Sequence, residues 1–340
     1  MIPLQNGERI YHPHPGSAMI PLNANAMRFS YNRQFYTKHM RTLLLCFMLL
    51  TAGGYLQSTA QSLSNIPAPL EPSATQYFQN QYLANPAMAG IDTGVHLNAA
   101  YRHQLNGIDG APVSKYFTAD GYFGNRVGGG IHVFNDQAGL MNRSRIALSY
   151  AYHLPLSDRG QYLHFGLSLA MNFQRIDYKL INGDDTDPSI GAFNRRDNYF
   201  EGEFGMAYTD QHWTLQGSLP NIRSVFTGDN KAVDGGTLYF TAVAYKFQPE
   251  GAVSSIVPKV CFRGVRGANN IVDAGVNVGF LHDVASVLAL YHTSGSFTGG
   301  LGVNIMQTVT LQAMYTTQTN GIKTYVDGGY EIGLTINLFK

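Results

Sequence analysis

Apolar and polar residues alternate one by one over long stretches of this chain, and this period of two restricts its fold more than any other feature. In residues 163–174, Leu, Phe and Met at odd positions alternate with small or polar residues at even positions. Residues 146–154 and 330–338 repeat the pattern. Successive side chains of a β-strand point to opposite faces, whereas a helix repeats every ~3.6 residues. The sequence therefore predicts strands with one apolar face, and no segment shows a sustained helical period.

About fourteen such runs follow one another from residue 95 onward, each of roughly 8 to 15 residues, and a tilted strand needs about 9 to 11 residues to cross a bilayer. The runs are therefore long enough to be membrane-spanning strands. The expected strands are 95–102, 113–123, 126–134, 142–154, 161–176, 199–209, 212–219, 237–247, 254–264, 270–281, 284–292, 296–305, 308–316 and 329–339.

The connections between these runs alternate in length. The short ones are pairs of residues, at 124–125, 210–211, 282–283 and 306–307. The others are mostly long, at 103–112, 177–198, 220–236 and 317–328. Short turns at one end and long loops at the other are typical of outer-membrane barrels. A soluble sandwich does not separate loop lengths in this way, and its strands average only about 5 to 6 residues.

We therefore predict an all-β fold, a closed antiparallel transmembrane β-barrel of about 14 strands over residues 95–340. Its apolar outer face would contact outer-membrane lipid. An even number of strands brings both ends of the barrel to the short-turn side, so both termini are expected in the periplasm. A closed barrel also has no free strand edge to protect.

The composition excludes several other classes of protein. Only 13% of residues are charged, against roughly 25% in an ordinary soluble domain, and glycine is frequent at 37 residues. A net charge of +1 leaves no basic face for nucleic acid. Two cysteines exclude a disulfide scaffold and a cysteine-rich metal site.

The N-terminal part carries the pattern of a signal peptide. The apolar run 43–50 is too short to span a bilayer, follows the basic residues Lys38 and Arg41, and precedes the small residues Ser58 and Ala60. We predict a signal peptide at 40–60, cleaved after Ala60. The chain is therefore divided into an upstream extension at 1–39, the signal peptide, a periplasmic N-terminal segment at 61–94, and the barrel. The upstream extension is expected to be disordered or untranslated, and the chain could start at Met1, Met27 or Met40.

The residues that could carry chemistry are dispersed. His153 and His164 fall on inward-facing positions and are interpreted as polar residues of the lumen. The acidic residues Asp184, Asp185 and Asp187 lack the ligand spacing of a calcium loop and are interpreted as a solvated surface.

Other signals in the sequence also favour structural roles. Cys261 lies in an apolar run and is interpreted as a packing residue. The glycines at 128–130 lie inside a strand, where they would relieve crowding or allow a bend. The chain has no nucleophile elbow and no phosphate-binding glycine loop. We therefore expect no enzyme activity, with no catalytic, cofactor-binding or metal-binding residues.

Several short motifs resemble one known family. They are Asn85-Pro86-Ala87-Met88-Ala89-Gly90, then Tyr101-Arg102-His103-Gln104, Leu148-Ser149-Tyr150-Ala151-Tyr152-His153-Leu154 and Leu219-Pro220-Asn221. The first is the most specific. Together they are similar to the PorP/SprF family of Bacteroidetes outer-membrane proteins, which is tied to type IX secretion and gliding motility, over about residues 70–340.

The resemblance implies a non-catalytic outer-membrane component or cargo partner of the type IX secretion and gliding machinery. Its partners would be periplasmic apparatus proteins, or the C-terminal domain of a secreted adhesin or other cargo. Cargo contacts are expected in the long loops, with Phe193, Tyr199 and Phe226 as anchors. Apparatus docking is expected around Asn85 and Pro86, unless this pair only shapes the approach to the first strand.

A second function remains open, which is an outer-membrane channel for small or hydrophobic solutes. About fourteen strands enclose more space than the eight whose side chains fill a small barrel. Residues 61–94 are long enough to fold inward as a plug. The sequence shows no ring of charged residues that would mark a constriction.

Overall fold

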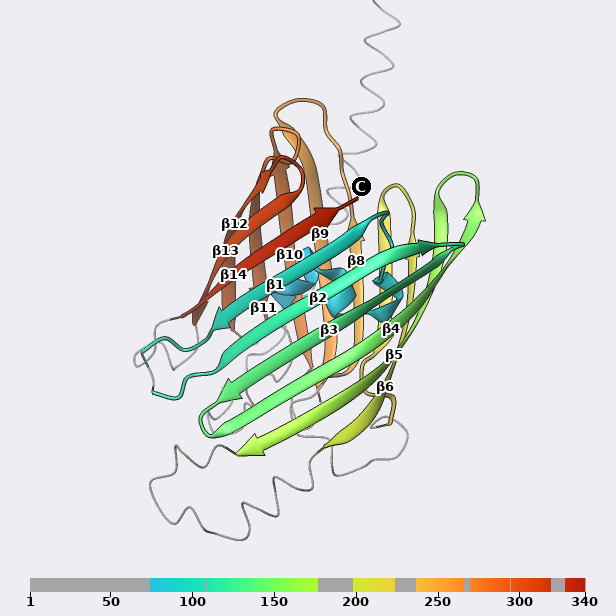
Figure 1. Cartoon of the computed structure of the whole chain (residues 1–340). Helices are drawn as coiled ribbons and strands as arrows, with labels where there is room; N and C mark the ends of the chain where they lie inside the picture. The colour runs from blue at the N-terminus through green and yellow to red at the C-terminus, as the bar shows by residue number, and fades with distance from the viewer. Residues whose placement is uncertain are drawn as a thin grey trace, which may run out of the picture. The chain divides into compact units, whose positions relative to one another are not determined.

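The computed structural model describes residues 74–107, 109–176, 198–223, 237–265, 270–293, 295–318 and 328–339. Within them, fourteen strands form one closed antiparallel barrel in which each strand pairs with its neighbours in the sequence and β1 pairs with β14 (Figure 1). The strands are β1 (Val95–His103), β2 (Val113–Gly124), β3 (Val127–Ala138), β4 (Met141–Ser157), β5 (Gln161–Ile176), β6 (Tyr199–Thr209), β7 (Trp213–Leu219), β8 (Thr237–Tyr245), β9 (Val253–Val265), β10 (Ile271–Phe280), β11 (Ala285–His292), β12 (Ser296–Ile305), β13 (Val309–Gln318) and β14 (Gly329–Leu338).

The barrel confirms the fold class expected from the alternating pattern. Each of the fourteen expected runs is a strand, and the strand ends lie within four residues of the expected ones. The alternation also sets which side chains face the membrane. On β5, His164, Ser168 and Asn172 are buried inside, whereas Leu167 and Leu169 are 57% and 61% exposed on the outside. Burying the polar face and leaving the apolar face outside suits a barrel surrounded by lipid.

At one end of the barrel, tight turns connect successive strands. Asn125 and Arg126, between β2 and β3, have φ angles of 51° and 69°, and Met306 and Gln307, between β12 and β13, have 54° and 58°. Two successive positive φ values match the right-handed twist of the paired strands in a two-residue hairpin. The long loops at 177–198 and 220–236, including the acidic residues at 184–187, lie wholly or mostly outside the described residues.

Exposed aromatic side chains lie near both ends of the strands. Tyr122, Tyr162 and Trp213 are near the short turns. Near the opposite end the exposed aromatic residues are Tyr101, Tyr291, Phe297 and Tyr330. Two such girdles mark the membrane–water interfaces of an outer-membrane barrel. No helix in the described part of the chain has the length and apolarity needed to cross a membrane.

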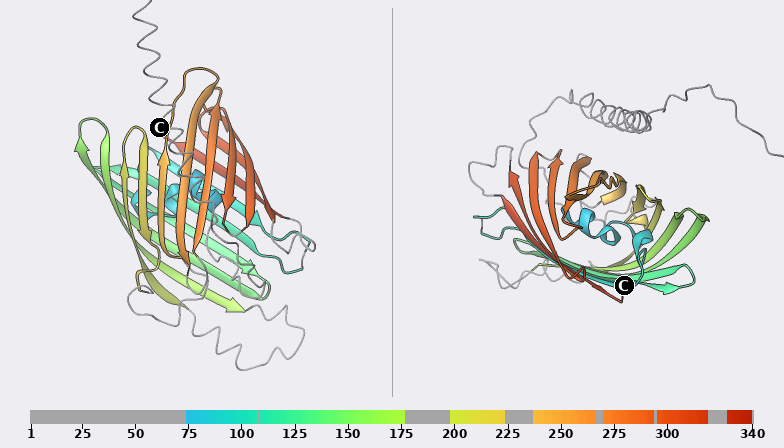
Figure 2. Two further views of the ribbon diagram at one scale, coloured as in Figure 1. Left: turned by 180° about the vertical axis from the view of Figure 1, so that it is seen from behind. Right: turned by 90° about the horizontal axis from the view of Figure 1, so that it is seen from above.

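A short N-terminal segment lies inside the barrel. It contains α2 (Ala74–Gln79) and two 3-10 helices, η2 (Gln81–Leu83) and η3 (Pro86–Met88), and the view along the barrel in Figure 2 shows it within the ring of strands. We call residues 74–90 the plug. The sequence interpretation placed 61–94 in a periplasmic segment, and the described part of that segment occupies the lumen, as a plug would.

Candidate functional site: the lumen plug and its seat

Asn85 joins the plug to the barrel wall. Its Oδ1 accepts a hydrogen bond from the Ala87 N–H at 3.0 Å, which caps η3. Its Nδ2 donates to the main-chain oxygens of Met206 on β6, at 3.0 Å, and of Gly217 on β7, at 3.4 Å. The side chain is fully buried. Pro86 follows in the first turn of η3, where its fixed φ suits a helix and its missing N–H is not needed.

Glycines on three strands make room for η3. A Cβ on Gly128 of β3 would lie 2.0 Å from the Ala89 oxygen, and one on Gly166 of β5 would lie 2.2 Å from the Ala87 nitrogen. A Cβ on Gly205 of β6 would lie 2.0 Å from Asn85 Oδ1. These approaches are too close for any side chain, so the three glycines form a seat for the plug. The result confirms that the glycines at 128–130 relieve crowding.

Gly90 ends the plug and turns the chain toward β1. Its φ is +64°, a left-handed conformation that glycine adopts without a steric penalty. Its N–H donates to Asp120 Oδ2 on β2 at 2.9 Å, and an added Cβ would lie 2.2 Å from the Gly121 oxygen. Each residue of the motif at 85–90 therefore has a structural role in the plug. Asn85 caps η3, Pro86 begins it, residues 87–89 pack in the lumen core, and Gly90 makes the turn.

Further hydrogen bonds tie the plug to strands all around the barrel. Tyr82 donates to Ser149 Oγ on β4 at 2.8 Å, and burial raises the pKa of its hydroxyl well above the usual range, so it remains a neutral donor. The other contacts are Asn80 Nδ2 to Thr118 Oγ1 (2.7 Å), Ser218 Oγ to the Ala84 oxygen (2.6 Å), Lys259 Nζ to the Tyr77 oxygen (2.5 Å), Gln216 to Gln81, and Gln76 to Glu331.

The apolar clusters of the lumen are also built around the plug. Tyr82, Ala87, Met88 and Ala89 pack against Ala151 and Ala207. Tyr77 packs with Phe240, Ala242 and Cys261, and Phe78 packs against Leu288, Leu290 and Met314. The packing role expected for Cys261 is confirmed. The plug is thus the central part of the lumen core.

A charged network fixes the start of the loop after β7. Arg145 of β4 donates to Glu203 Oε1 on β6, through Nε at 3.1 Å, and both groups lie inside the barrel. The same guanidinium donates to the Pro220 oxygen at 2.7 Å and to Asn221 Oδ1 at 3.0 Å. Asn221 Nδ2 in turn donates to the Thr237 oxygen at the start of β8. The Leu219-Pro220-Asn221 motif is therefore held by an arginine three strands away on the wall.

A second network lies inside the barrel on β9, β10 and β11. Arg263 on β9 pairs with Asp273 Oδ2 on β10 at 2.9 Å, and His292 Nδ1 on β11 is 2.6 Å from Asp273 Oδ1. Sequence reasoning missed both networks, although the inward position of each member follows from the alternating pattern. Which inward residues meet depends on the register of neighbouring strands.

His153 and His164 point inward as expected. Their Nδ1 atoms are 2.8 Å apart, and His164 Nε2 is 2.8 Å from Thr209 Oγ1. In the described part of the chain, no three His, Cys, Asp or Glu residues are placed to hold a metal ion.

Three of the five residues expected to contact partners lie in the described part of the chain. Asn85 and Pro86 are buried in the seat, and Tyr199 begins β6 at the long-loop end. Phe193 and Phe226 lie outside the described residues. Sequence reasoning did not identify the wall residues that hold the plug.

The family of the chain follows from its sequence profile. The model of the family described as type IX secretion system membrane protein PorP/SprF matches residues 68–336, which include the plug and nearly the whole barrel. This chain belongs to the PorP/SprF family. PorP/SprF membership makes it a membrane component of type IX secretion, and its closed fourteen-stranded barrel agrees with a place in the outer membrane. No curated protein matches the chain significantly.

Several solved outer-membrane barrels are similar to this PorP/SprF protein. Omp33 of Acinetobacter baumannii is 12% identical, with a TM-score of 0.43, over 74% of this chain and 100% of that one. The toluene transporter TbuX of Ralstonia pickettii is 11% identical, with a TM-score of 0.48, over 75% and 92%. The monoaromatic hydrocarbon channel CymD is 10% identical, with a TM-score of 0.47, over 81% and 95%.

Proposed function

We propose that this protein is a non-catalytic partner in type IX secretion, which binds the C-terminal domain of a secreted protein or periplasmic apparatus proteins and does not serve as an open pore. The observation that carries the proposal is the plug. The most specific family motif, at 85–90, is used to fix a segment across the lumen, and hydrogen bonds from the plug reach β2, β4, β6, β7, β9 and β14. A barrel closed in this way offers its rims and loops, rather than its interior, as working surfaces.

The long loops are the proposed cargo surface. Loops at 177–198 and 220–236 carry Phe193 and Phe226, and Tyr199 follows the first of them. Aromatic side chains are frequent anchors of protein interfaces. The Arg145 network supports this proposal because it holds both ends of the 220–236 loop, at Asn221 and at Thr237.

Apparatus docking is proposed for the opposite, short-turn end. Asn85 and Pro86 are buried, so in this proposal they act by holding the plug in place and do not touch a partner with their own side chains. Exposed residues of the short turns, such as Arg126 between β2 and β3, would supply the contacts themselves.

The test is an affinity pull-down of tagged protein from detergent-solubilised envelope, together with an inventory of surface proteins in a deletion strain. Loss of one secreted protein from the surface would identify a cargo-specific partner, and loss of many would identify an apparatus component. If the tagged protein recovers no secretion component or secreted protein, and the inventory is unchanged, the proposal is wrong.

A channel for small or hydrophobic solutes is the alternative, and one observation favours it. A polar cavity of about 370 Å³ remains in the lumen beside the plug. Purified protein in liposomes would distinguish the two functions. Solute flux that rises with the amount of wild-type protein, and that one lumen substitution blocks, would favour transport over partner binding.

A further inference from the structure

The polar cavity beside the plug lies toward the short-turn end of the lumen. Phe78 and Gln81 of the plug form one side, and strands β7 to β13 form the rest. Its volume of about 370 Å³ lies in the range of ~300–1,000 Å³ that small-ligand sites occupy. The contacts that anchor the plug leave this space open.

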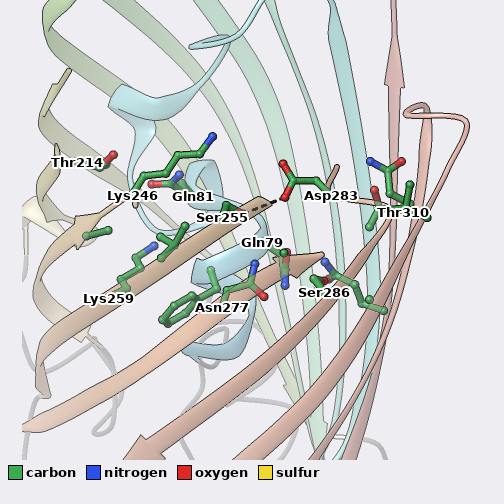
Figure 3. A pocket seen from close by; sticks show the side chains of 18 of the residues that line it. Gln79, Gln81, Thr214, Lys246, Ser255, Lys259, Asn277, Asp283, Ser286 and Thr310 are labelled. Atoms are coloured by element: carbon green, nitrogen blue, oxygen red, sulfur yellow. Dashed lines mark hydrogen bonds between the residues drawn. The ribbon is translucent and has the colours of Figure 1, made fainter. Parts of the chain in front are cut away.

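The charged groups of the cavity are separated. Figure 3 shows Lys246 and Lys259 on one side and Asp283 across from them. Lys259 Nζ donates to the Tyr77 oxygen and stands 5.2 Å from the centre of the Phe78 ring, while Lys246 is exposed at the mouth. Among the described residues, neither ammonium forms an ion pair with a carboxylate, so both remain available to an anion.

Asp283 is held in the orientation that Figure 3 shows. The Ser255 hydroxyl donates to Asp283 Oδ1 at 2.9 Å, and the Asp283 N–H donates to Ser254 Oγ at 3.0 Å. A carboxylate fixed in this way, opposite two ammonium groups, favours a ligand that carries both a negative and a positive end.

Two amide side chains that line the cavity have oxygens without donors. Asn277 Oδ1 and Asn304 Oδ1 are buried, and neither has a hydrogen-bond partner in the described part of the structure. A buried acceptor without a donor is unfavourable, so a small turn of either amide toward a ligand N–H group in the cavity would be favourable. A peptide main chain supplies such groups.

We propose that this cavity binds a short peptide with free ends. The terminal carboxylate lies toward Lys246 and Lys259, the terminal ammonium lies toward Asp283, and main-chain N–H groups meet Asn277 and Asn304. The proposal stands apart from the role in secretion, because it rests only on the charges, the acceptors and the volume of the cavity.

The test is isothermal titration calorimetry of the full protein in detergent, with trialanine as the probe. Trialanine with an amidated C-terminus and trialanine with an acetylated N-terminus each lack one of the two charges. We expect trialanine to bind, and each capped form to bind roughly fivefold more weakly, which corresponds to about 1 kcal/mol.

Two variants connect these losses to particular residues. In Lys246→Gln the difference in affinity between the free and amidated peptides should shrink, with Lys259 left as the remaining partner of the carboxylate. In Asp283→Asn the acetylated and free peptides should bind equally, because this variant removes the partner of the terminal ammonium. Arg159→Gln, in the β4–β5 turn and outside the cavity, is the matched control and should behave as the wild type. Heat-modifiable migration on gels checks that every variant is folded.

Absence of trialanine binding to the wild type would overturn the proposal. The proposal would also be overturned if the ratio of free to capped peptide affinity in Lys246→Gln and in Asp283→Asn were as large as in the Arg159→Gln control.

Discussion

At the scale of single residues, Asn85 and the seat glycines explain why the plug stays in the lumen. Both Nδ2 hydrogens of Asn85 donate to main-chain oxygens of the wall, and its Oδ1 caps η3. No other residue of the same size offers two donors and one acceptor in this geometry. Gly166 lies against the plug main chain and Gly205 lies against the Asn85 side chain, so there is no room for a Cβ on either glycine.

Asn85→Asp should release the plug while leaving the barrel closed. The substitution keeps the shape but places a buried carboxylate against two carbonyl oxygens, and an uncompensated buried charge is destabilising by about 3–5 kcal/mol. Chymotrypsin should then cleave at Tyr77 or Tyr82, which are buried in the wild type. Asn125→Asp, in an exposed turn, is the control and should leave cleavage unchanged.

Gly166→Ala should loosen the plug through steric overlap alone. The new Cβ would lie 2.2 Å from the Ala87 nitrogen, and overpacking of this kind is destabilising by about 1–3 kcal/mol. Gly217→Ala is the matched control, since no atom lies within 4 Å of its added Cβ. Faster chymotrypsin cleavage in Gly166→Ala than in Gly217→Ala is the expected result, and equal rates would contradict the seat.

At the scale of elements, the strands are joined by ion pairs inside the lumen as well as by their ladders. Arg145 and Glu203 lie on β4 and β6, two strands apart, and the same arginine holds the segment that follows β7. His132 of β3 lies 3.7 Å from Glu203 and extends the group to a third strand. The network therefore couples the wall to the root of one long loop.

Arg145→Met should destabilise the barrel more than the double variant Arg145→Met with Glu203→Met does. The single change leaves Glu203 as a buried charge without its arginine, a loss of about 3–5 kcal/mol, whereas removing both partners of a buried pair is often nearly neutral. The temperature at which the barrel loses its heat-modifiable gel mobility measures the difference. A double variant as unstable as the single one would show that Arg145 stabilises the barrel through its other contacts, such as those to Pro220 and Asn221, and not through the ion pair.

At the scale of the whole molecule, the plug and the barrel have separate sources of stability. The strands form an uninterrupted ring of main-chain hydrogen bonds from β1 to β14, with β1 and β14 closing it. The plug adds side-chain contacts to that ring and belongs to no ladder. Its removal should therefore open the lumen without opening the barrel.

Deletion of residues 76–88 should leave a folded barrel with a larger ion conductance than the wild type in planar bilayers. The reason is that these residues supply the side chains that occupy the centre of the lumen. The Gly217→Ala variant serves as a full-length control. Equal conductance of the deleted and full-length proteins would mean that the plug does not limit the pore.

The sequence alone determined the strands, because a strand is encoded residue by residue. The alternation in 163–174 specifies which side chains face inward, and the tight turn at Asn125 and Arg126 needs no distant contact. Tertiary structure alone decided the position of the plug and the pairing of charges. Gln76 meets Glu331, 255 residues away, and Arg145 meets Glu203, 58 residues away. The alternating pattern predicts that such a side chain points inward. Which residue it contacts depends on the register of every intervening strand and on the closure of the ring.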